Sequence, residues 1–200
     1  PGYARETAKL FLDLLLANGT TTAAVYCTVH PESADAFFEE STARNLRMIA
    51  GKILMDRNAP ESVKDTAQSG YDDSKALIGK WHGRGRNLYA VTPRFAPTST
   101  PAQLEACGTL MAEFDDIYLQ SHVSENTDEV KWVAELFSDT RSYQDVYARF
   151  GMLGPRALYG HAIHMDEADL AQAAETNTKF VHCPTSNLFI GSGLFRLNET

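Results

Sequence analysis

The chain has 200 residues, 44% of them hydrophobic, and a formal net charge of −8 with no long run of either sign. The apolar content predicts one core over residues 1–200, and the acidic balance argues against nucleic acid or an anionic membrane surface as a partner. No apolar stretch approaches the roughly 18 residues of a membrane span, no secretory leader is present, and the three cysteines are widely spaced, which favours a cytoplasmic protein.

Apolar periodicity divides the chain into alternating helices and strands. The first helix is predicted over residues 6–17, where apolar positions such as Leu10 and Leu14 recur at helical spacing. A β-branched strand follows at residues 20–29, and Pro31 is well placed to begin the next helix. Further strands are predicted at 48–55, 88–92, 117–122, 157–161 and 180–183, and further helices at 72–81, 101–114, 130–137, 142–150 and 166–175.

About six strands that alternate with helices imply parallel pairing through right-handed crossovers. An open doubly wound sheet and a (β/α)₈ barrel both fit this pattern. The doubly wound sheet would need a glycine-rich phosphate turn directly after a strand, and no such turn is present. Polar residues cluster instead where the strands end, which is typical of the barrel. We therefore predict a TIM-type barrel.

Polar residues follow four of the predicted strands, and they are the candidates for chemistry. Strand alternation gives Gln120 and His122 a common face, so His122 is expected to point into the barrel mouth, with Glu125 just past the strand end. An imidazole and a nearby carboxylate can bind a metal and move protons around its water, although a lone histidine is more often structural. The strand ends read VTPRF, QSHVSEN, GHAIHM and HCPTSN.

These strings, together with NGTTTA near the start, resemble those of guanine deaminases in the amidohydrolase superfamily. The resemblance covers essentially all of residues 1–200, and PRF combined with SHVSEN carries most of its specificity. It implies an incomplete (β/α)₈ TIM-type barrel that contains about strands 2 to 7. The family's first-strand His-x-His and eighth-strand Asp have no counterpart here, so this chain alone is expected to bind zinc poorly and to be inactive.

The resemblance also implies roles for individual residues. His122 is similar to the metal ligand of the fifth barrel strand, Glu125 to the acid/base carboxylate, and His161 to the histidine that orients the metal-bound hydroxide. Arg94 and Phe95 resemble the pair that contacts guanine. The substrate-binding residues implied in this way are Arg94, Phe95, His122, Val123, Ser124 and Glu125.

The activity implied by the resemblance is zinc-dependent hydrolysis of guanine to xanthine and ammonia. One zinc ion per site is expected, with iron as the alternative metal, and the expected assembly is a homodimer. Two other readings stay open. One is an amidohydrolase that acts on a different purine, a pterin, a pyrimidine or a triazine ring. The other is a non-catalytic barrel segment, truncated or degenerate.

Overall fold

A computed structural model describes residues 2–197 of the chain. Within this range the strands are β1 (Thr22–Tyr26), β2 (Arg47–Gly51), β3 (Ile53–Leu54), β4 (Leu88–Pro93), β5 (Tyr118–Val123), β6 (Ala157–His161) and β7 (Lys179–Val181). The helices are α1 (Gly2–Ala17), α2 (Pro31–Ala43), α3 (Ala67–Trp81), α4 (Pro101–Glu113), α5 (Thr127–Leu136), α6 (Tyr143–Arg149), α7 (Glu167–Thr176) and α8 (Pro184–Phe189), with two 3₁₀ turns, η1 (Glu61–Val63) and η2 (Ala96–Thr98).

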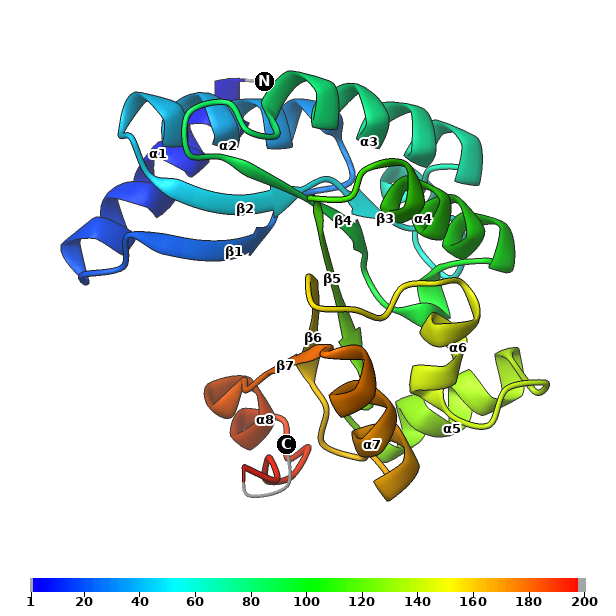
Figure 1. The fold of residues 1–200 in the computed structure, drawn as a ribbon. Coiled ribbons are helices and arrows are strands. Elements are labelled where there is room, and N and C mark those ends of the chain that lie inside the picture. The colour runs from blue at the N-terminus through cyan, green and yellow to red at the C-terminus, as the bar shows by residue number, and fades with distance from the viewer. Residues whose placement is uncertain (1, 198–200) are drawn as a thin grey trace.

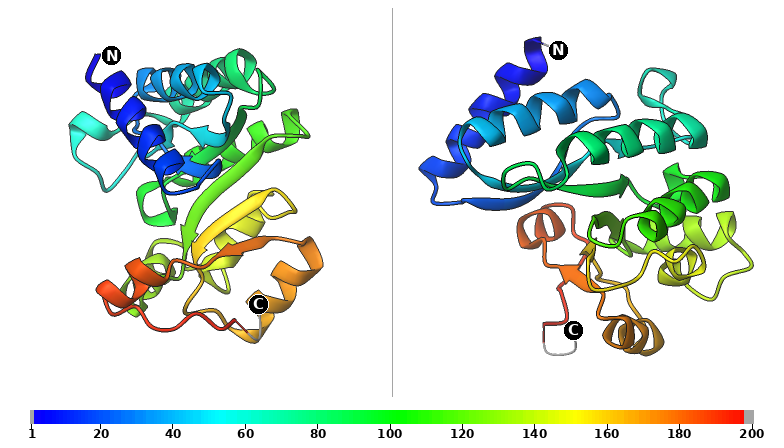
Figure 2. Two further views of the ribbon diagram at one scale, coloured as in Figure 1. Left: turned by 90° about the vertical axis from the view of Figure 1, so that its left-hand side faces the viewer. Right: turned by 45° about the horizontal axis from the view of Figure 1, so that its top comes forward.

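The strands form one parallel sheet in the order β1-β2-β4-β5-β6-β7, with β3 beside β4. Neighbours in the sheet follow chain order, so each connection returns over the same side. Figure 1 shows α1, α2 and α3 on one side of β1 and β2, and the two views of Figure 2 agree. This arrangement is an incomplete (β/α) barrel, which confirms the predicted fold class.

Local sequence signals explain where several helices begin. The Thr100 hydroxyl accepts a hydrogen bond from the Gln103 amide, and Pro101 occupies the first turn of α4. Helix α3 begins five residues before the predicted position 72, because Thr66 and Ser69 form a capping box ahead of it.

The core lies between the sheet and its outer helices, and Phe38, Met48 and Tyr89 are fully buried there. Gly51 is required where β2 approaches β4, because a Cβ atom at this position would lie 1.8 Å from the Ala90 carbonyl oxygen. No helix among residues 2–197 has both the length and the apolarity to cross a membrane.

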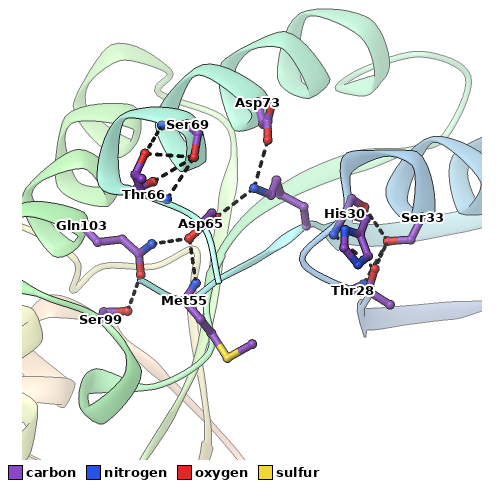
Figure 3. A network of polar contacts seen from close by, with 11 residues as sticks. Thr28, His30, Ser33, Met55, Asp65, Thr66, Ser69, Asp73, Ser99 and Gln103 are labelled. Atoms are coloured by element: carbon purple, nitrogen blue, oxygen red, sulfur yellow. Dashed lines mark hydrogen bonds and ion pairs between the residues drawn. The ribbon is translucent and has the colours of Figure 1, made fainter. Parts of the chain in front are cut away.

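The loop after β3 is held by a buried network of polar groups (Figure 3). Lys52 is 1% exposed, and its Nζ donates to Asp65 at 2.9 Å and to Asp73 at 3.1 Å. Asp65 also accepts from the Met55 amide at 3.2 Å and from Gln103 Nε2 at 2.8 Å. The predicted strand 48–55 is split at Lys52 into β2 and β3. The network therefore ties the carboxyl end of β3 to α3 and α4.

Candidate active site

The carboxyl ends of β5 and β6 bring His122, Glu125 and His161 together. The parallel register pairs Val123 with His161, so the two histidines stand on adjacent strands. Their rings stack with centroids 5.3 Å apart and planes at 23°. Glu125 Oε1 lies 3.3 Å from His161 Nδ1. The three groups for which the sequence predicted ligand, acid/base and orienting roles are therefore neighbours.

One hydrogen bond sets the orientation of His122. Its Nδ1 lies 2.6 Å from the Arg94 carbonyl oxygen, and because a carbonyl only accepts, Nδ1 carries the hydrogen. The lone pair of Nε2 is then free, as in most metal-binding histidines. Burial lowers the pKa of His122, with the bond to Arg94 opposing this shift, so the ring favours the neutral form that binds metals.

His122 fits a metal as a single ligand. Among residues 2–197, no group of three or more His, Cys, Asp or Glu side chains is arranged to hold a metal ion. This agrees with the absence of the His-x-His and Asp motifs from the sequence.

Two residues of α8, Ser186 and Asn187, lie next to Glu125 and His161. Asn187 is buried, and its Oδ1 accepts from His161 Nδ1 at 2.7 Å. The Ser186 hydroxyl lies 3.5 Å from Glu125 Oε1. Both residues belong to the sequence HCPTSN at positions 182–187, but no role was predicted for either of them. The available signal was a pair of short polar side chains after a strand end.

The backbone around the site adopts strained conformations. Ser124, His161 and Ala162 have φ angles of 49°, 74° and 47°, in the left-handed region that side chains disfavour. The loops after β5 and β6 are joined because the Ala162 amide donates to the Val123 carbonyl at 3.0 Å, and the next two amides donate to the Ser124 carbonyl. Val123 and Ser124 are buried, and their predicted contact with substrate stays a prediction.

Arg94 and Phe95 leave the carboxyl end of the neighbouring strand β4. The Arg94 guanidinium is exposed and lies 4.7 Å from the centroid of the Phe95 ring. Phe95 meets Trp132 edge-on, with centroids 6.3 Å apart. The Arg94 backbone touches the site directly through its bond from His122. The structure therefore places this predicted pair next to the histidine and carboxylate cluster.

Two further contacts at the site had no counterpart in the sequence reasoning. The Tyr26 ring, at the end of β1, lies 4.8 Å from the His122 ring. Arg57, in the loop after β3, donates to the Ala96 carbonyl at 3.0 Å. An aromatic residue at a strand end was a usable signal for Tyr26, whereas nothing in the sequence around Arg57 indicates its partner.

A curved parallel sheet with imidazoles and a carboxylate at the carboxyl ends of adjacent strands is the arrangement of the (β/α)-barrel class, with its candidate site at the mouth of the barrel. The sequence model of the amidohydrolase family matches residues 1–200, and the chain belongs to this family.

Several relatives are guanine deaminases, the family that the sequence resemblance indicated. The guanine deaminase of Escherichia coli (strain K12) is 49% identical over 98% of this chain and 45% of its own length. The solved E. coli structure gives a TM-score of 0.98 over 99% of this chain and 46% of that one. A guanine deaminase from C. acetobutylicum with bound guanine in the active site is 30% identical, with a TM-score of 0.93 over 99% of this chain and 48% of that one. The chain spans about half the length of these relatives.

Proposed function

We propose that the protein containing this chain hydrolyses guanine to xanthine and ammonia. The observation that carries the proposal is the cluster of His122, Glu125 and His161 beside Arg94 and Phe95, in a chain 49% identical to a guanine deaminase. The guanine-bound relative, which shares the fold with a TM-score of 0.93, supports the choice of substrate.

Glu125 is the proton carrier in this proposal. The carbon of guanine that bears the exocyclic amine becomes more electrophilic when the adjacent ring nitrogen is protonated, and a carboxyl group can supply that proton. The carboxylate takes that proton from the attacking water, and after the attack it moves the second proton of this water from the new hydroxyl group to the leaving amine, which departs as ammonia. Glu125 is partly exposed at the mouth and lies within 3.3 Å of His161, which keeps it close to the reacting atoms.

His161 orients the attacking oxygen and, as an imidazolium whose Nε2–H donates, stabilises the negative charge that develops on that oxygen. Its Nδ1 is engaged by Asn187 and Glu125, so Nε2 is the ring atom left for this task. His122 would hold zinc, or iron, through Nε2 as one ligand. A bound zinc ion would acidify water to a pKa of about 7 and so supply a nucleophile at neutral pH.

Arg94 and Phe95 account for the selectivity for guanine in this proposal. A guanidinium presents several N–H donors in a fixed planar arrangement, which suits the carbonyl edge of guanine. The Arg94 side chain is exposed directly after the end of β4. The Phe95 ring, next to Arg94, offers a face on which the purine can stack. We further propose a homodimer in the cytoplasm, on the basis of the family resemblance.

The variant Glu125→Gln tests the proposed proton carrier in the protein expressed from its complete reading frame. We expect turnover of guanine to fall about 100-fold or more, since that is the usual contribution of a positioned acid/base group, while the zinc content is kept. Glu135→Gln is the matched control, because Glu135 is an exposed carboxylate further along α5. Turnover by Glu125→Gln equal to that of the control would remove Glu125 from the mechanism.

A further inference from the structure

Tyr147 lies on α6, outside every motif that the sequence analysis used, and it is fully buried. Its hydroxyl donates to the His122 carbonyl at 2.8 Å and accepts from the Ala96 amide at 2.9 Å. The Ser121 hydroxyl, at 3.1 Å, is the third partner. The Tyr147 hydroxyl therefore has three polar partners, and in the pair with Ser121 either oxygen can be the donor.

Two of these partners belong to different parts of the candidate site. Ala96 directly follows the pair Arg94 and Phe95, and His122 is the candidate metal ligand. A second bridge joins the same two segments, because His122 Nδ1 donates to the Arg94 carbonyl at 2.6 Å. On its other side, the Ala96 carbonyl is held by Arg57 at 3.0 Å. The Ser121 hydroxyl also lies 3.3 Å from the Arg94 carbonyl oxygen. The backbone of residues 94–96 is thus attached to the end of β5 through both Arg94 and Ala96.

We propose that Tyr147 is a positioning residue that keeps residues 94–96 aligned with His122 without touching the substrate. This inference rests on the proposed function, in which Arg94 and Phe95 contact guanine. Burial raises the pKa of Tyr147 well above its ordinary value, so the hydroxyl keeps its hydrogen near neutral pH. Loss of the hydroxyl would leave the Ala96 amide and the His122 carbonyl without a partner at a site that water does not reach.

Tyr159 provides a matched control for Tyr147. It is also buried, at 1% exposed, and its ring lies 4.7 Å from that of Tyr147. Its hydroxyl donates to the Met152 carbonyl at 2.9 Å, away from residues 94–96. Removal of either hydroxyl costs buried hydrogen bonding, but only the hydroxyl of Tyr147 connects two parts of the site.

The test compares Tyr147→Phe with Tyr159→Phe in the zinc-loaded protein expressed from its complete reading frame. We expect Tyr147→Phe to raise the KM for guanine about five- to tenfold with little change in kcat, and Tyr159→Phe to leave KM unchanged. In an Arg94→Ala background, Tyr147→Phe should cause a smaller loss of kcat/KM than in the wild type, because part of its effect acts through Arg94. Additive losses, or an equal rise in KM for Tyr159→Phe, would overturn the proposal.

A second readout does not depend on the reaction. Amide hydrogen exchange of a peptide covering residues 94–98 should be faster in Tyr147→Phe than in the wild type, and unchanged in Tyr159→Phe. If the wild-type protein releases no ammonia from guanine, the proposed function fails, and unaltered exchange in Tyr147→Phe would separately overturn the positioning role. If Tyr147→Phe does not fold, Ser121→Ala takes its place. This variant also removes the contact of the Ser121 hydroxyl with the Arg94 carbonyl at 3.3 Å, so unaltered exchange of residues 94–98 in it would overturn the proposal as well.

Discussion

Glu129 is a buried carboxyl group on α5, four residues after Glu125. It is 8% exposed, and its Oε1 has no hydrogen-bond partner among the residues that the structure describes. Burial raises the pKa of Glu129, and the negative charge of Glu125 adds to this effect. The folded protein therefore binds the Glu129 proton more tightly than the unfolded chain does.

Glu129→Gln is predicted to stabilise the protein at neutral pH. As the pH rises from the unfolded pKa of about 4.3 through the raised folded pKa, the unfolded chain releases its proton first, and the wild type loses stability. A glutamine side chain does not ionise, so the stability of the variant lacks this dependence on pH. The Tm of the variant should therefore exceed that of the wild type at pH 8 and approach it near pH 4. A variant less stable than the wild type at pH 8 would contradict this assignment.

Strand alternation indicated the direction of His122, which is the next-to-last residue of β5. The roles of Glu125, His161 and the pair Arg94 and Phe95 came from the resemblance to guanine deaminases. Asn187 and Tyr147 could not be found in this way. Their partners lie 26 and 51 residues away in the chain, and Tyr147 sits inside a helix where it resembles any other apolar core residue.

At the scale of elements, the loop after β3 depends on ionic contacts around Lys52. Asp65→Ala is predicted to lower the free energy of unfolding by about 3 kcal/mol, because it removes one partner of a buried ammonium group and leaves the Gln103 amide unpaired. The exposed Asp72 on α3 is the control, and Asp72→Ala should change stability by less than about 0.5 kcal/mol. Chemical denaturation of both variants measures the difference, and equal effects would show that the network is not stabilising.

The order and type of the long elements could be predicted because each helix and strand has a clear period. The packing face of α1 could not. Its sequence is apolar on several sides, and the structure buries Ala8 and Leu12 while Leu10 and Leu14 are 62% and 54% exposed. Periodicity indicates that a helix forms, but when apolar residues surround it, only the neighbouring elements decide which face is buried.

At the scale of the whole molecule, apolar surface is exposed at both ends of the sheet. Beside β1, a cavity of about 620 Å³ opens between α1 and α2, with Phe11, Val25 and Phe37 in its wall. Beyond β7, Leu188 and Phe189 are 65% and 89% exposed. Strands β1 and β7 are also the two ends of the hydrogen-bonded sheet order.

A polypeptide of residues 1–200 expressed alone is predicted to self-associate, because an exposed edge strand beside apolar surface favours pairing between chains. Size-exclusion chromatography with light scattering measures this directly. Leu10→Glu combined with Leu14→Glu should increase the monomer fraction, since both side chains are exposed on α1. A wild-type polypeptide that elutes as a monomer would show that these surfaces do not cause self-association of residues 1–200.

The central claim is tested most directly by ammonia release from the protein expressed from its complete reading frame with zinc. Guanine, adenine, cytosine and a triazine would be offered side by side. We predict release from guanine alone. Release from another ring instead would keep the hydrolytic site and contradict the substrate, and no release from any of the four would contradict the activity and favour a non-catalytic barrel segment.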